Sequence, residues 1–130
     1  MNKLMFKLCL IGLIGMPVLS SASSTTDEDF CALLKSAKAE MDDVFSKIQQ
    51  KKRNDLVFLE AMNKSQKQWR EYVDAELVMQ FPSANLFDYG SVLPMCQCVS
   101  RLGLTQERIA TLRQWLEPVV EGDVCTGSTR

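Results

Sequence analysis

Residues 55–79 read DLVFLEAMNKSQKQWREYVDAELVM and contain neither proline nor glycine. Large and mostly apolar side chains recur in this stretch at intervals of three and four residues, which is the period of one face of an α-helix. The inward stripe that we expect consists of Leu56, Leu59, Met62, Gln66, Trp69, Val73 and Leu77. Phe81-Pro82 ends the segment, because a residue that precedes proline disfavours the helical conformation. The stretch therefore predicts one long amphipathic helix.

The segments on both sides of this helix show the same period. One stripe precedes it and one follows it: Phe30, Leu33, Leu34, Ala37, Met41, Val44, Phe45 and Ile48, then Met95, Val99, Leu102, Ile109, Leu112 and Leu116. Gly103 interrupts the last stripe, which leaves either one kinked helix or two short ones. No stretch alternates with a period of two, so we expect no sheet. The sequence predicts an all-α fold, a small antiparallel bundle of three or four helices in up-down-up order with disulfides.

Residues 1–22, MNKLMFKLCLIGLIGMPVLSSA, have the pattern of a secretory signal peptide. A basic start precedes an apolar run over residues 8–19, and small residues follow it. The run is too short to span a bilayer. We expect cleavage after Ala22 and a mature protein without a membrane anchor, located in the periplasm or outside the cell. Residues 23–130 then form a single helical domain, of which 118–130 are a polar tail.

The composition excludes several classes of function. The chain has no histidine, which excludes Ser-His-Asp and Cys-His catalysis and histidine metal sites. The formal net charge is −1. It becomes −3 without the leader, which removes Lys3 and Lys7 and leaves 13 basic residues against 16 acidic ones. Such a balance lacks the basic footprint of a nucleic-acid-binding protein. We therefore expect no enzyme activity, no cofactor, no bound metal and no nucleic-acid partner.

Four segments carry motifs in a fixed order along the chain. Residues 66–76, QKQWREYVDAE, resemble the pattern Q-x-x-W-x-x-[YF]-R-D-A-E-C, with Val73 where the pattern has arginine, and residues 39–45, AEMDDVF, resemble A-E-[LM]-N-x-x-Y. Residues 90–95, GSVLPM, are similar to G-G-S-x-x-P-M, and residues 98–112 are similar to C-L-x-x-L-T-x-x-R-x-x-E-L. Together the segments resemble the lysozyme inhibitor LprI-like family. The resemblance implies a small exported helical domain.

Four cysteines follow the leader, Cys31, Cys96, Cys98 and Cys125, and an even number in an exported chain predicts two disulfides. The first and third helices of the expected bundle start at the same end, so Cys31 lies near both Cys96 and Cys98. Leu77 stands where the family has a cysteine, whereas Cys98 holds a family position. The resemblance therefore favours a bridge between Cys31 and Cys98. Cys125 in the tail then pairs with Cys96, and exchange of Cys96 and Cys98 is the alternative.

The second helix carries four motif residues, Gln66, Trp69, Tyr72 and Asp74. Trp69 lies at the centre of the inward stripe, so we expect it in the core rather than stacked on a ligand. The three polar residues around it have two interpretations. They form a binding site, or they hydrogen-bond across helices and so fix the packing of the bundle.

The connection over residues 82–90, PSANLFDYG, is irregular and yet carries Leu86, Phe87, Asp88 and Tyr89. Apolar and aromatic side chains on such a loop are either tucked onto the end of the bundle or presented to a protein partner. We take these four residues as the candidate partner-binding site.

The resemblance implies a binding protein of the bacterial envelope whose partner is a lysozyme-type muramidase. Inhibition would then be steric, since a protruding segment would block the cleft of the enzyme. The alternative is a structural or immunity-type envelope protein with a different protein partner.

Overall fold

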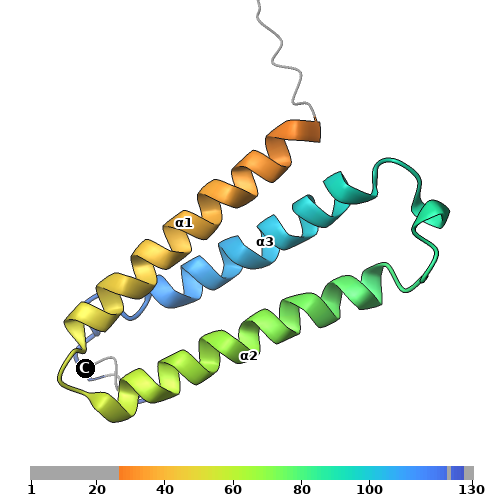
Figure 1. Cartoon of the computed structure of the whole chain (residues 1–130). Helices are drawn as coiled ribbons and strands as arrows, with labels where there is room; N and C mark the ends of the chain where they lie inside the picture. Colours follow the sequence, from red (N-terminus) through yellow and green to blue (C-terminus); the bar gives the residue numbers. More distant parts are fainter. Residues whose placement is uncertain (1–26, 123, 128–130) are drawn as a thin grey trace, which may run out of the picture.

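The computed structural model describes residues 27–122 and 124–127, and the expected leader lies outside them. The elements are α1 (Asp27–Lys51), α2 (Leu56–Gln80), the short 3-10 helix η1 (Leu86–Tyr89) and α3 (Leu93–Arg113). No strand occurs in the described part of the chain. Helices α1 and α3 run in the same direction, and α2, which connects them in the chain, runs in the opposite direction (Figure 1). The predicted all-α, up-down-up arrangement is confirmed.

Local chemistry sets both ends of α2. A carboxylate oxygen of Asp55 accepts a hydrogen bond from the backbone N–H of Phe58 at 3.0 Å, which satisfies a donor that has no partner within the helix. At the other end the N–H of Phe81 donates to the carbonyl of Leu77 at 2.9 Å, and Pro82 follows. The helix therefore covers nearly the stretch that the sequence predicts.

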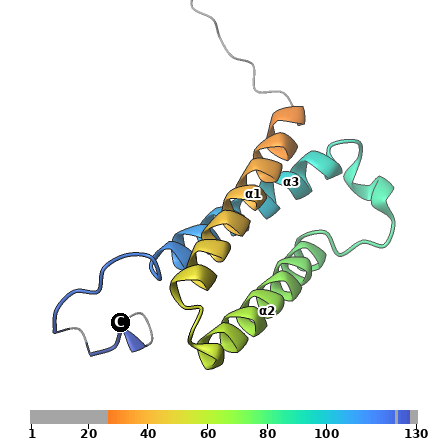
Figure 2. The same cartoon turned by 60° about the vertical axis from the view of Figure 1, so that its left-hand side comes forward.

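The core lies mainly between α1 and α3, which pack along each other in both views (Figures 1 and 2). α2 contacts α3 more sparsely than α1 does. The buried residues of this core are Leu34, Ala37, Met41, Val44 and Ile48 of α1, Phe58 and Met62 of α2, and Leu102, Ile109 and Leu112 of α3. Most of them belong to the predicted stripes, because burial follows the helical period.

Three of the expected inward residues are exposed instead: Leu33, Leu56 and Val99. Leu56 is 75% exposed and Phe58 is buried in its place, because residues two apart lie on opposite sides of a helix. Val99 is 41% exposed, whereas Leu93 and Thr105 of the same helix are buried. The inward face of α3 is therefore rotated away from Val99.

Gly103 does not split the third helix, which continues from Leu93 to Arg113. An added Cβ at this glycine would meet no atom within 4 Å, so the position is open rather than crowded. The two alternatives from the sequence are thereby resolved in favour of one helix and a three-helix bundle. Just after α3 the chain makes a tight turn, in which the N–H of Leu116 donates to the carbonyl of Arg113 at 2.9 Å.

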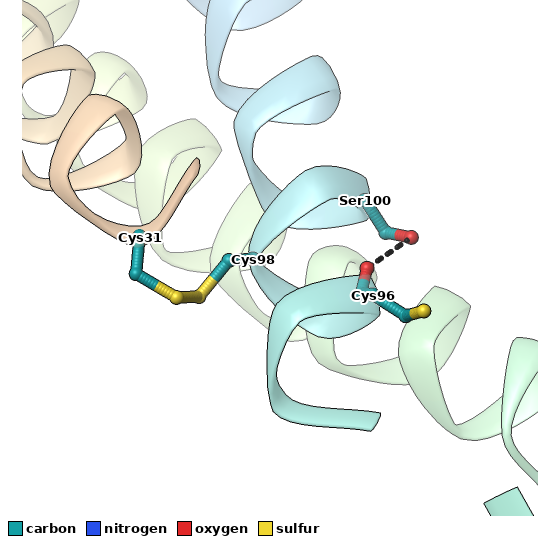
Figure 3. Close-up of a disulfide and its surroundings, with 4 residues drawn as sticks. All are labelled: Cys31, Cys96, Cys98 and Ser100. Carbon is teal, nitrogen blue, oxygen red and sulfur yellow. Dashed lines mark hydrogen bonds between the residues drawn. A yellow bond between two sulfur atoms is a disulfide. The ribbon is translucent and has the colours of Figure 1, made fainter. Parts of the chain in front are cut away.

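The disulfide between Cys31 and Cys98 joins the first turns of α1 and α3 (Figure 3). The sulfur atoms are 1.98 Å apart and the Cα atoms 5.1 Å apart, over a sequence separation of 67 residues. The bridge that the resemblance favoured is confirmed. It also confirms that α1 and α3 start at the same end of the bundle.

The second expected bridge, Cys96–Cys125, is wrong. Cys96 lies near the start of α3 and keeps its thiol, which points away from the neighbouring disulfide (Figure 3). Cys125 lines one open pocket together with Thr111 and Trp115, which lie at the opposite end of that helix. About 15 helical residues separate the two places, which is about 22 Å of helix. Bridged Cα atoms lie within about 7 Å, so the tail would have to fold back along the whole helix.

Removal of the Cys31–Cys98 bridge should lower the free energy of unfolding by about 4 kcal/mol, because the unfolded chain gains the entropy of a long open loop. Denaturant titration of the Cys31→Ser, Cys98→Ser double variant measures this loss. Cys96→Ser is the matched control and should change stability by no more than about 0.5 kcal/mol. Equal stability of the double variant and the control would contradict the structural role of the bridge.

Candidate functional site

The candidate site is the connection between α2 and α3, at the end of the bundle away from the α1–α2 turn (Figure 1). η1 forms its central part and begins after Asn85, whose side-chain oxygen accepts from the N–H of Phe87 at 3.2 Å. Gly90 ends it with a φ of 68°, in the left-handed region where glycine is favoured. A side-chain cap and a glycine thus define this compact turn.

A network of hydrogen bonds fixes the shape of the loop. The hydroxyl of Tyr89 accepts from the N–H of Ser83 at 2.7 Å. The hydroxyl of Ser83 donates to one carboxylate oxygen of Asp88, and the amide of Asn85 donates to the other at 3.0 Å. Both carboxylate oxygens of Asp88 therefore accept hydrogen bonds from within the loop.

The four candidate residues divide into two pairs. Tyr89 is half-buried, and its ring meets that of Phe81 edge-on, with centroids 5.4 Å apart and planes at 85°. Tyr89 thus holds the loop against Phe81, whereas the exposed Asp88 bonds to Ser83 and Asn85 within the loop. Phe87 is 93% exposed and Leu86 is 63% exposed, so both point their apolar surface to solvent. Tyr89 is therefore tucked against Phe81, whereas Leu86 and Phe87 are exposed.

Beside the exposed phenylalanine lies an open hollow of about 400 Å³. Its walls are Leu86, Phe87, Gly90, Ser91, Leu93 and Pro94. A convex ring next to a mostly apolar hollow is the type of surface that binds a protein partner through a buried aromatic anchor.

Gln66 joins all three helices. It is only 3% exposed, its amide nitrogen lies 3.4 Å from the sulfur of Met41 on α1, and its amide oxygen accepts from Nε of Arg108 on α3 at 3.0 Å. The same guanidinium donates to the hydroxyl of Ser65 at 3.1 Å. Arg108 lies three residues after Thr105 in the fourth motif, but the motif alone does not indicate the bond to Gln66.

The other motif residues of α2 have different environments. Trp69 is half-buried and packs against the core, and it lines an open pocket of about 340 Å³ between the three helices. Asp74 pairs with Arg101 of α3 at 2.9 Å, across the two helices. Tyr72 is 49% exposed. Loss of hydration, followed by the Glu76 carboxylate, raises the pKa of its hydroxyl above the ordinary value.

Within residues 27–122 and 124–127, no group of three or more cysteine, aspartate or glutamate side chains is placed to hold a metal ion. None of the helices described there is long and apolar enough to cross a membrane.

The fold and the loop define a class: a small disulfide-linked helical bundle that presents an aromatic side chain from a hydrogen-bonded loop. The chain belongs to the lysozyme inhibitor LprI family, whose model matches residues 19–112. Comparisons with curated proteins and with solved structures gave no match.

Replacement of Gln66 by leucine should lower the free energy of unfolding by about 1–3 kcal/mol, because Nε of Arg108 loses its buried acceptor while the volume is nearly kept. Denaturant unfolding measures the change. Gln68→Leu, at an exposed position two residues along the same helix, is the control and should leave stability nearly unchanged. If both variants unfold alike, Gln66 does not hold the helices together.

Replacement of Tyr89 by phenylalanine should loosen the loop without changing its exposed surface, since only the acceptor of the Ser83 N–H is lost. We expect chymotrypsin to cleave after Phe87 several-fold faster, because cleavage follows local opening. Helical circular dichroism should stay at the parent level. A cleavage rate equal to that of the parent would show that this hydrogen bond does not restrain the loop.

Proposed function

We propose that this protein is an exported, non-catalytic binding protein that inhibits a lysozyme-type muramidase by blocking its cleft. Membership of the lysozyme inhibitor LprI family supports this class of partner. The observation that carries the proposal is Phe87, a large aromatic side chain that is 93% exposed on a hydrogen-bonded loop. An exposed anchor of this kind is typical of a surface that a partner covers.

The loop acts as a preformed plug. Its internal hydrogen bonds have already ordered the backbone, so binding costs less conformational entropy than it would for a flexible segment. Phe87 and Leu86 then fill apolar subsites of the enzyme cleft, and the bulk of the bundle excludes the substrate. The acidic balance of the mature chain assists encounter with a basic enzyme, as lysozymes commonly are.

Export is supported by two features. The first 22 residues have the pattern of a signal peptide, and the bridge between Cys31 and Cys98 is of the kind that persists in oxidising compartments. We place the mature protein in the periplasm or outside the cell, where a muramidase meets its peptidoglycan substrate.

The double variant Leu86→Ala, Phe87→Ala should lose at least about tenfold in affinity for the inhibited lysozyme, because truncation of a central aromatic anchor costs at least about 2 kcal/mol. Clearing of a peptidoglycan suspension by a panel of lysozymes, with and without the protein, measures inhibition. Calorimetry measures the binding constant.

The matched control is Leu56→Ala, Val57→Ala, which truncates two side chains that are 75% and 81% exposed at the other end of the bundle. This control should inhibit like the parent. If the loop variant folds and still inhibits, the interface lies elsewhere. If the parent inhibits no lysozyme of the panel, the muramidase assignment fails and a different envelope protein is the partner.

A further inference from the structure

A second pocket lies between the start of α2 and the end of α3, away from the loop. It has a volume of about 510 Å³. Phe58 and Met62 of α2, Leu112 of α3 and Trp115, which lies just after α3, line it, and the rings of Phe58 and Trp115 meet with centroids 5.0 Å apart. Its size and its apolar and aromatic walls are those of small-molecule sites.

One cation lines this apolar pocket, the guanidinium of Arg108. It is half-buried and donates to the neutral groups of Gln66 and Ser65. No carboxylate in the described part of the chain pairs with it. The neighbouring arginines of the same helix differ, since Arg101 pairs with Asp74 and Arg113 with Glu40.

A partly buried charge without a counter-ion is unfavourable, because its hydration is lost and nothing of opposite sign replaces it. In agreement, desolvation lowers the pKa of Arg108 below its ordinary value. A guanidinium has five N–H donors, and the bonds to Gln66 and Ser65 use only part of them. An anion at the pocket would use the remaining donors and balance the charge.

We propose that this pocket binds a medium-chain fatty acid, with the carboxylate on Arg108 and the acyl chain along Phe58 and Trp115. The pocket is polarised in a way that fits this orientation. Ser65, which accepts a hydrogen bond from Arg108, marks the cationic end of the pocket. The acidic residue of the pocket, Asp55, lies about ten residues before Ser65, which corresponds to about 15 Å along the helix. The carboxylate of Asp55 also accepts the N–H of Phe58.

An acyl chain fits these walls better than a peptide does. A peptide brings backbone N–H and C=O groups, which would lose hydration against Met62, Leu112 and the two rings without gaining partners. Arg108 is the cation among the lining residues, and a cation beside apolar walls matches a molecule with one anionic head and one apolar tail. The ammonium of Lys52 lies outside this lining, 5.7 Å from the centroid of the Phe58 ring. The site is independent of the loop and of the proposed inhibition.

Titration of the whole mature protein with decanoate, octanoate and decanol tests the site, with tryptophan fluorescence and calorimetry as readouts. Decanoate should bind about 15-fold tighter than octanoate, because each buried methylene contributes about fourfold. Decanol should bind at least about tenfold more weakly than decanoate, since it lacks the charge that Arg108 requires. Equal binding of decanol and decanoate would overturn the role assigned to Arg108.

Two variants that replace an alanine of α2 by tryptophan distinguish binding in this pocket from binding elsewhere on the surface. Ala61→Trp fills the pocket without removing a native hydrogen bond and should abolish decanoate binding. Ala75→Trp, at an exposed position on the same helix outside the pocket, should bind like the parent. Circular dichroism checks that both are folded. Undiminished binding by Ala61→Trp, or equal loss in both variants, would overturn the proposal.

Discussion

The bridge between Cys31 and Cys98 is the constraint on which the rest of the arrangement depends. It joins the first turns of α1 and α3, so the two helices run parallel from a common end and bury their apolar faces against each other. The chain must then return through α2, which lies outside this pair (Figures 1 and 2). The loop that presents Phe87 enters α3 a few residues before Cys98, so the candidate site stands at the covalently held end.

Helix α2 is attached in a different manner from α1. Polar side chains link it to α3 along its length: Gln66 accepts from Arg108, Asp74 pairs with Arg101, and Gln80 accepts from the hydroxyl of Ser100 at 2.6 Å. Such long side chains hold two helices together at a distance and do not fill the space between them. Open pockets therefore lie between α2 and its neighbours, one beside Trp69 and one beside Trp115. The second provides the site that we propose for an apolar anion.

Periodicity was sufficient to predict the helices and most of the core, because burial of Ile48, Ile109 and Leu112 follows directly from helical spacing. Periodicity says nothing about loops or tails. Tyr89 turns inward because its hydroxyl meets the N–H of Ser83, and that contact exists only in three dimensions. The path of the tail that carries Cys125 has no apolar repeat, so the second bridge was predicted wrongly.

We expect the disulfide-linked pair of α1 and α3 to be more stable against local opening than α2. Native-state hydrogen exchange of the oxidised protein tests this expectation most directly. Amides near Ile48 and Ile109 should exchange only through global unfolding, because they lie in the most buried part of the core. Amides in the middle of α2 should exchange with a lower opening free energy. After reduction of the bridge, the opening free energies of the three helices should become similar. Uniform protection of the three helices in the oxidised protein would contradict this hierarchy.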